Sequence, residues 1–235
     1  MANPFFKFKQ FTVFHDKCAM KVGTDGVLLG AWTNTADAAN LLDAGTGTGL
    51  IALMLAQRTN AAIDAIDIDE GACRQAAENV AGSPFSGRIR IIHSSFVGFQ
   101  PGRKYDLIVS NPPYFSQSLK SPDDKRSQAR HDDSLPLPDL IAGSKEMLSE
   151  NGRIALILPV EQEGKLDGLL TQYGLHRIRQ TNVMPVVNGQ IKRILIELSA
   201  TPNPHCAPDC LAIERERHKY TKEYEALTRD FYLNM

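Results

Sequence analysis

The sequence has few cysteines, no long apolar run and no excess of either charge. Its four cysteines, Cys18, Cys73, Cys206 and Cys210, are too sparse for a disulfide scaffold in a chain of 235 residues. Reduced thiols in a cytosol are the simpler interpretation, so we expect a cytoplasmic protein. No apolar run approaches the length of a membrane span, and residues 1–10 lack the apolar core of a signal peptide. We therefore expect no membrane partner.

The balance of charge limits the partners that the chain can bind. The formal net charge is −1, so a nucleic acid would have to bind a local basic patch. The chain has no internal repeat, and its length suits one α/β domain with a sizeable core. We expect a single domain over residues 1–235. It would comprise an N-terminal hairpin over 1–22, a core over 23–200 and a C-terminal tail over 201–235 that docks on the core.

The most informative stretch is the sequence Asn111, Pro112, Pro113 and Tyr114, which follows an apolar run typical of a buried strand. The prolines end the strand, so Asn111 lies at the carboxyl end, where open α/β sheets bind ligands. The Asn111 side-chain carbonyl and the Pro112 backbone carbonyl can each accept one N–H of a conjugated amine. This pairing favours the pyramidal nitrogen of a transition state, and Tyr114 offers a ring for stacking. The alternative is a plain turn that ends a strand.

A second signal is a glycine-rich turn between a predicted strand and a predicted helix. Asp43 ends the strand, and Gly45, Gly47 and Gly49 follow at alternate positions. Glycines there allow a ligand to lie against bare backbone. A dinucleotide fingerprint would need glycine or alanine where Leu50 stands, which argues against a pyrophosphate ligand. The spacing is that of an S-adenosylmethionine loop.

Other candidates follow the next strands along the chain. Asp67 ends a predicted strand about 20 residues after the glycine turn, where an acid holds ribose hydroxyls. Its alternative role is to cap a helix over 70–82, for which Asp69 is better placed. Ser95 and Phe96 follow a third strand and could contact an adenine, although Phe96 could also pack in the core. Lys21 and Thr24 precede a short helix and could border the pocket, although Thr24 could merely cap that helix.

Basic residues that could meet RNA phosphates gather in a long polar stretch over residues 115–133. Acidic residues nearly cancel their charge, so a solvated loop is the alternative. One small group, His205 with Cys206 and Cys210, is too limited to predict zinc, and we expect no metal site. The candidate RNA contacts are Lys120, Lys125, Arg126, Arg130, His131 and Arg193.

The order of these features resembles the class I S-adenosylmethionine-dependent methyltransferases. A glycine turn follows strand one, an acid follows strand two and Asn-Pro-Pro-Tyr follows strand four. The resemblance implies a Rossmann-like α/β fold, with a mostly parallel seven-stranded sheet, an antiparallel last strand and a small N-terminal β-hairpin. We also predict a helix over 134–150. The cofactor residues would be Lys21, Thr24, Asp43, Gly45, Thr46, Gly47, Gly49, Asp67, Ile68, Ser95, Phe96 and Asn111.

Residues 21–32 resemble the opening motif of the bacterial tRNA1(Val) (adenine-37)-N6-methyltransferases. Further similarities lie in residues 129–131, 192–198, 220–224 and 230–233. This resemblance implies N6-methylation of an adenine in tRNA, S-adenosylmethionine as cofactor, S-adenosylhomocysteine as product and tRNA as partner. The alternatives are a glutamine N5-methyltransferase of release factors, a ribosomal-RNA guanine N2-methyltransferase, and a binding module without turnover.

Overall fold

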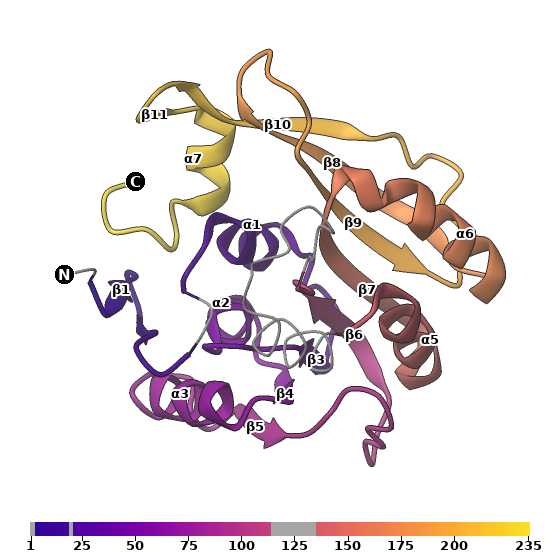
Figure 1. Ribbon diagram of the computed structural model, residues 1–235, viewed down its shortest axis with the longest axis horizontal. Helices are drawn as coiled ribbons and strands as arrows, with labels where there is room; N and C mark the ends of the chain where they lie inside the picture. Colours follow the sequence, from indigo (N-terminus) through magenta and orange to yellow (C-terminus); the bar gives the residue numbers. More distant parts are fainter. Residues whose placement is uncertain (1–2, 19–20, 114–134) are drawn as a thin grey trace, which may run out of the picture.

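The computed structural model describes residues 3–18, 21–113 and 135–235, and its centre is a mixed β-sheet (Figure 1). Within these residues the sheet has nine strands in the order β11-β10-β8-β9-β7-β6-β3-β4-β5. The apolar runs of the sequence form the middle strands of this sheet. Helices cover both faces there, so the side chains on both sides of these strands are buried and the strands do not alternate in polarity. The strands are β3 Asn40–Ala44, β4 Ala62–Asp67, β5 Ile89–His93, β6 Tyr105–Ser110, β7 Leu148–Pro159, β8 His176–Val186, β9 Arg193–Ser199, β10 Asp209–Glu216 and β11 Lys219–Tyr220.

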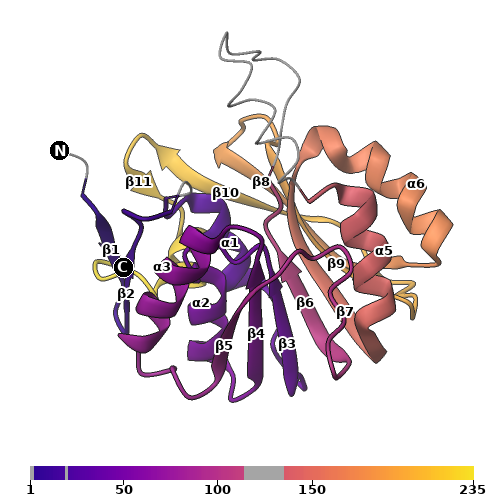
Figure 2. The same ribbon diagram turned by 60° about the horizontal axis from the view of Figure 1, so that its bottom comes forward.

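The strand directions decide which loops share an edge of the sheet. Strands β5, β4, β3, β6 and β7 are all parallel. Strand β9 is antiparallel to both β7 and β8, and β10 is parallel to β8. The carboxyl ends of β8 and β10 therefore lie at the same edge as the carboxyl ends of β3, β4 and β6 (Figure 2).

Helices cover both faces of the sheet and bury two apolar clusters. Figure 1 shows α1, α2, α3 and α7 over one face and α5 and α6 over the other. Among the described residues, no helix is both long and apolar enough to cross a membrane. The helices are α1 Thr24–Trp32, α2 Leu50–Arg58, α3 Glu70–Ala81, α5 Leu137–Met147, α6 Glu163–Tyr173 and α7 Lys222–Thr228, with a short 3-10 turn η1 at Val160–Gln162.

The predicted N-terminal hairpin is present as β1 Phe5–Lys7 and β2 Thr12–Phe14, which pair antiparallel. It lies beside the end of the chain (Figure 1), since Phe8 forms a β-bridge with Tyr232. Phe8 is buried between the rings of Phe11 and Tyr232, whose centroids lie 4.8 and 6.0 Å away. The first and last segments of the chain thus stabilise each other.

The predicted class I architecture is confirmed, and the structure adds two strands to the seven expected. β10 and β11 come from residues 209–220, and β10 pairs with β8 rather than with β9, the strand before it in the chain. The helix predicted over 134–150 was too long, because α5 ends at Met147 and β7 begins at Leu148. Leu148 pairs with Tyr105, and a Cβ at Gly152 would lie 2.8 Å from the Tyr105 carbonyl oxygen. Gly152 therefore permits a close strand contact rather than ending a helix.

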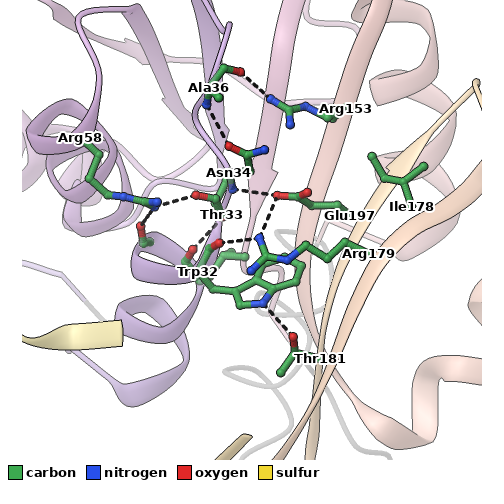
Figure 3. Close-up of polar contacts among 12 residues, drawn as sticks. Trp32, Thr33, Asn34, Ala36, Arg58, Arg153, Ile178, Arg179, Thr181 and Glu197 are labelled. Carbon is green, nitrogen blue, oxygen red and sulfur yellow. Dashed lines mark hydrogen bonds and ion pairs between the residues drawn. The ribbon is translucent and has the colours of Figure 1, made fainter. Parts of the chain in front are cut away.

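The carboxyl end of α1 is fixed to the sheet by a buried polar network (Figure 3). The Trp32 indole N–H donates to the Thr181 hydroxyl at 2.8 Å, and the Arg179 guanidinium lies 4.0 Å from the Trp32 ring centroid. Arg179 also donates to the Trp32 carbonyl, and Glu197 accepts from the Asn34 N–H at 2.8 Å. A cation–π contact and satisfied buried hydrogen bonds both hold a helix end in one place.

Candidate active site

The glycine turn joins β3 to α2 at the edge where the parallel strands end. Gly45, Gly47 and Gly49 have φ angles of 75°, 55° and 80°, a region that side chains strongly disfavour. The N–H groups of Gly45 and Thr46 donate to the Ile66 carbonyl at 2.9 Å, which fixes the turn against β4. A Cβ built on Gly45 or Gly47 would meet nothing within 4 Å. A ligand can therefore approach this backbone closely.

Asp43 lies under the turn and is completely buried. Its Oδ2 accepts from the Thr46 hydroxyl at 2.6 Å and from the Ala52 N–H at 3.1 Å. Its Oδ1 has no hydrogen-bond partner among the described residues. Burial raises the pKa of Asp43 to about 7, and the two hydrogen bonds oppose this shift. Asp43 thus shapes the turn from behind and does not line the cavity in front of it.

Asp67 ends β4 beside the glycine turn. Its Oδ2 accepts from the Gly47 N–H at 2.8 Å, and its Oδ1 accepts from the Asp69 N–H at 3.0 Å. Burial raises the pKa of Asp67 above its usual range, while these backbone hydrogen bonds oppose the shift. Each carboxylate oxygen retains a lone pair that can accept a hydroxyl. Asp69 caps α3 by accepting from the Ala72 N–H at 2.6 Å, so capping does not require Asp67.

An apolar wall adjoins Asp67. Two of its side chains are open to solvent, since Ile68 is 42% exposed and Val97 is 60% exposed. Phe96 lines the same cavity but is buried, and Ser94 and Ser95 lie between it and the end of β5. The Ser94 N–H donates to the Asp67 carbonyl at 2.9 Å, which joins the two strand ends. Exposed apolar side chains beside a carboxylate can hold a planar, partly polar ligand.

Asn111 and Pro112 continue β6 into the same space. The Ser110 hydroxyl donates to the Ala44 carbonyl at 2.7 Å. This bond ties the end of β6 to the end of β3 and brings Asn111 next to the glycine turn. Pro112 is buried, whereas Asn111 is partly exposed. Tyr114 lies outside the described residues.

The amino end of α1 forms the opposite wall. Gly23 is the N-cap residue, and no side chain caps the helix. Neither Thr24 nor Asp25 therefore acts as the cap, and both line the cavity instead. Asp25 accepts from the Arg193 Nε at 2.8 Å. Arg193 was predicted to contact RNA, and the structure places it at the start of β9 against this wall.

These groups surround one cavity of about 900 Å³, a volume in the range of cofactor and substrate pockets. Of the predicted cofactor residues, Gly49 and Asp43 do not line it, and neither does Arg193 among the predicted RNA contacts. The predicted RNA contacts Lys120, Lys125, Arg126, Arg130 and His131 lie outside the described residues. The predicted residues that line the cavity are Lys21, Thr24, Gly45, Thr46, Gly47, Asp67, Ile68, Ser95, Phe96, Asn111, Pro112 and Pro113.

Among the lining residues that the sequence analysis did not name, three come from a segment outside the motifs. Leu135, Pro136 and Asp139 reach the cavity from the segment that begins α5. Asp139 lies in the first turn of that helix, and no motif surrounds it that would single it out. Within the described part of the chain, no group of three or more His, Cys, Asp or Glu side chains could hold a metal ion.

The chain is similar to proteins of known family over most of its length. Residues 13–177 match the methyltransferase small domain. A tRNA1(Val) (adenine(37)-N6)-methyltransferase from Parabacteroides distasonis is 56% identical over all of both chains. One of the same name from Bacteroides thetaiotaomicron is 49% identical, again over all of both chains.

Solved structures share the fold at low sequence identity. A predicted O-methyltransferase from Agrobacterium tumefaciens superposes with a TM-score of 0.65 at 17% identity, over 88% of this chain and 96% of the other. The glycopeptide N-methyltransferase MtfA with bound S-adenosylmethionine superposes with a TM-score of 0.54 at 13% identity, over 76% of this chain and 88% of the other. Together, the full-length relatives and the matched domain show that the chain belongs to the tRNA1(Val) (adenine(37)-N6)-methyltransferase family.

Proposed function

We propose that this chain methylates N6 of an adenine in tRNA, specifically adenine-37 of tRNA1(Val), with S-adenosylmethionine as methyl donor and S-adenosylhomocysteine as product. One observation carries the proposal. A single cavity joins an open glycine turn, a carboxylate at the end of β4 and the Asn111-Pro112 sequence. The chain's full-length relatives bear the name of that activity. We expect the enzyme to act in the cytoplasm, where its substrate is found.

The chemistry of the residues around the cavity supports S-adenosylmethionine as its ligand. The open backbone at Gly45 and Gly47 suits the methionine part, and Asp67 can accept ribose hydroxyls. Ile68 and Val97 provide exposed apolar surface for the adenine ring. The Lys21 ammonium and the first turn of α1 offer positive charge to a carboxylate. When bound, the cofactor supplies a methyl group on an activated sulfonium.

Asn111 and Pro112 would orient the acceptor amine. The Asn111 side-chain carbonyl and the Pro112 carbonyl each accept one N–H of the adenine amine. This arrangement favours a pyramidal nitrogen whose lone pair is free to form the new N–C bond. Holding the amine in line with the methyl group provides much of the rate enhancement, and the surplus proton passes to solvent. Tyr114 would stack on a base that has been flipped out of its strand.

Methyl transfer from labelled S-adenosylmethionine to total tRNA, taken from a strain that lacks the modification, tests the proposal. We expect N6-methyladenosine in the valine tRNA fraction after nucleoside analysis. In a parallel reaction with a release factor as substrate, label in one of its glutamines, with none in tRNA, would assign the neighbouring activity and contradict the tRNA substrate. Tight cofactor binding without transfer to any RNA or protein would indicate a binding module.

A further inference from the structure

The two strands that the sequence did not predict extend the sheet beyond its core. β10 pairs with β8, and β11 pairs with β10 as the last strand on that side (Figure 1). A turn at Arg217 and His218 joins them, with His218 at a φ of 65°. Since β10 is parallel to β8, this turn lies at the same edge of the sheet as the cavity.

The turn between β10 and β11 has a positive formal charge, whereas the whole chain has a formal charge of −1. Residues 215–219, which span the turn, contain three basic side chains and one acidic side chain, a formal charge of +2 with His218 neutral, and Glu214 and Glu223 lie near them in the sequence. Arg215, Arg217 and Lys219 are all exposed. Lys219 forms an ion pair of 2.9 Å with Glu216, but both side chains are more than 60% exposed, so the pair is weak and can open. Phosphates could therefore reach these cations.

An aromatic side chain lies among these charges. Tyr220 is 37% exposed, and its ring centroid lies 5.0 Å from that of Tyr224, which is buried. Tyr220 pairs with Glu214, and Glu214 also pairs with Val186 at the end of β8. Tyr224 and the strand register fix the tyrosine in place, so its exposed face is preorganised to stack on a base.

A continuous series of contacts links this turn to the cavity wall. The Val187 N–H donates to the Glu214 carbonyl at 2.9 Å, which joins β10 to the turn between β8 and β9. That turn ends at exposed Lys192, and the next residue, Arg193, donates to Asp25 of the cavity wall at 2.8 Å. An extended polyanion with one nucleotide in the cavity could therefore follow this edge of the sheet.

We propose that an arm surface, formed by Lys192, Arg215, Arg217, Lys219 and Tyr220, binds the backbone of the tRNA and stacks one unpaired base outside the cavity. This proposal rests on the proposed function, because it concerns the same substrate. Charged residues also protect edge strands from pairing with other chains. That protective role requires neither an exposed, fixed tyrosine nor a position beside the cavity.

The test compares two double variants of the full-length protein that remove the same charge. Arg217→Ala with Lys219→Ala removes two cations from the arm surface. Lys104→Ala with Lys145→Ala removes two cations from the edge of the sheet that lies opposite the cavity, where β6 begins and α5 ends. We measure the Kd for an unmodified valine tRNA transcript from 50 to 200 mM salt, the Kd for S-adenosylmethionine, and kcat.

We expect the arm variant to raise the Kd for tRNA about tenfold and to reduce the salt slope by about 2, since two phosphate contacts are lost. Its Kd for S-adenosylmethionine and its kcat at saturating tRNA should match those of the parent. The opposite-edge variant should change the tRNA affinity less than about twofold. Tyr220→Ala should weaken binding about tenfold with an unchanged salt slope, and Tyr220→Phe should restore binding, because the ring is retained.

If the two double variants changed the Kd for tRNA equally, the proposal that the arm surface binds tRNA would be wrong, and the proposed function would stand. A parent protein that binds the transcript but never methylates it would instead contradict the proposed function. Variants that change the molar mass in light scattering, but leave tRNA affinity unchanged, would assign the surface to contacts between copies of the chain and also overturn the proposal.

Discussion

The two ends of helix α1 lie in different surroundings. Its amino end lines the cavity, has no side-chain cap and forms an ion pair between Asp25 and Arg193, whose side chains are 28% and 33% exposed. Its carboxyl end is buried, and Trp32 and Thr33 are held by several hydrogen bonds (Figure 3). We therefore expect one helix to separate two tasks, with stability coming from the buried end and ligand binding from the end that lines the cavity.

The largest expected effect comes from breaking the buried end. Trp32→Ala removes a side chain that is 4% exposed, its hydrogen bond to Thr181 and its stacking with Arg179. We expect the free energy of unfolding to fall by about 3–5 kcal/mol, measured by urea denaturation. Trp32→Phe keeps an aromatic ring and should lose less. A loss below about 1 kcal/mol in the alanine variant would show that this end does not anchor the helix.

Asn111→Ala tests the cavity that the amino end of α1 lines. It should lower kcat about 100- to 1000-fold, equivalent to about 3–4 kcal/mol, because one acceptor for the reacting amine is lost. Urea denaturation should show a change below about 1 kcal/mol. Asn111→Asp retains an accepting oxygen and should lose less activity than the alanine variant. Methyl transfer at the normal rate in Asn111→Ala would contradict the proposed role.

Asp43 makes stability depend on pH. Burial raises its folded pKa from 3.8 to about 7, so its contribution to stability is complete below pH 4 and is lost as pH rises through 7. Asp43→Asn removes this titration. The free energy of unfolding of the variant, minus that of the parent, should therefore increase by about 2–4 kcal/mol between pH 4 and pH 8. Urea denaturation without cofactor measures this difference, and a constant difference would show that Asp43 titrates normally.

The smallest effect on stability is expected at the open end of α1. Asp25→Asn breaks a partly exposed ion pair, so the free energy of unfolding should fall by less than about 1 kcal/mol. Cofactor affinity, measured by titration calorimetry, should still change several-fold because Asp25 lines the cavity. A larger loss of stability than in Trp32→Ala would reverse the comparison between the two ends.

Motifs that act within a few residues of the chain could be predicted from the sequence. The glycine turn, Asp67 and Asn111 each follow a strand, and parallel strands bring their carboxyl ends to one edge. The structure places all three around one cavity. Local propensity also identified Asp69 as the cap of α3.

The remaining features depend on contacts between distant parts of the chain. Arg193 meets Asp25 across 168 positions in the sequence, so its partner could not be predicted from spacing. β10 was missed because its residues show no strict alternation and because it pairs with β8 rather than with the preceding strand, β9. Asp139 was missed because only the folding of α5 brings it to the cavity.

The central claim is that this cavity methylates one defined adenine. The most direct measurement is single-turnover methyl transfer to two valine tRNA transcripts, one with adenine at position 37 and one with guanine there. We expect label in the adenine transcript only, recovered as N6-methyladenosine. Equal label in both transcripts, or label in neither under conditions where both bind, would contradict the claim.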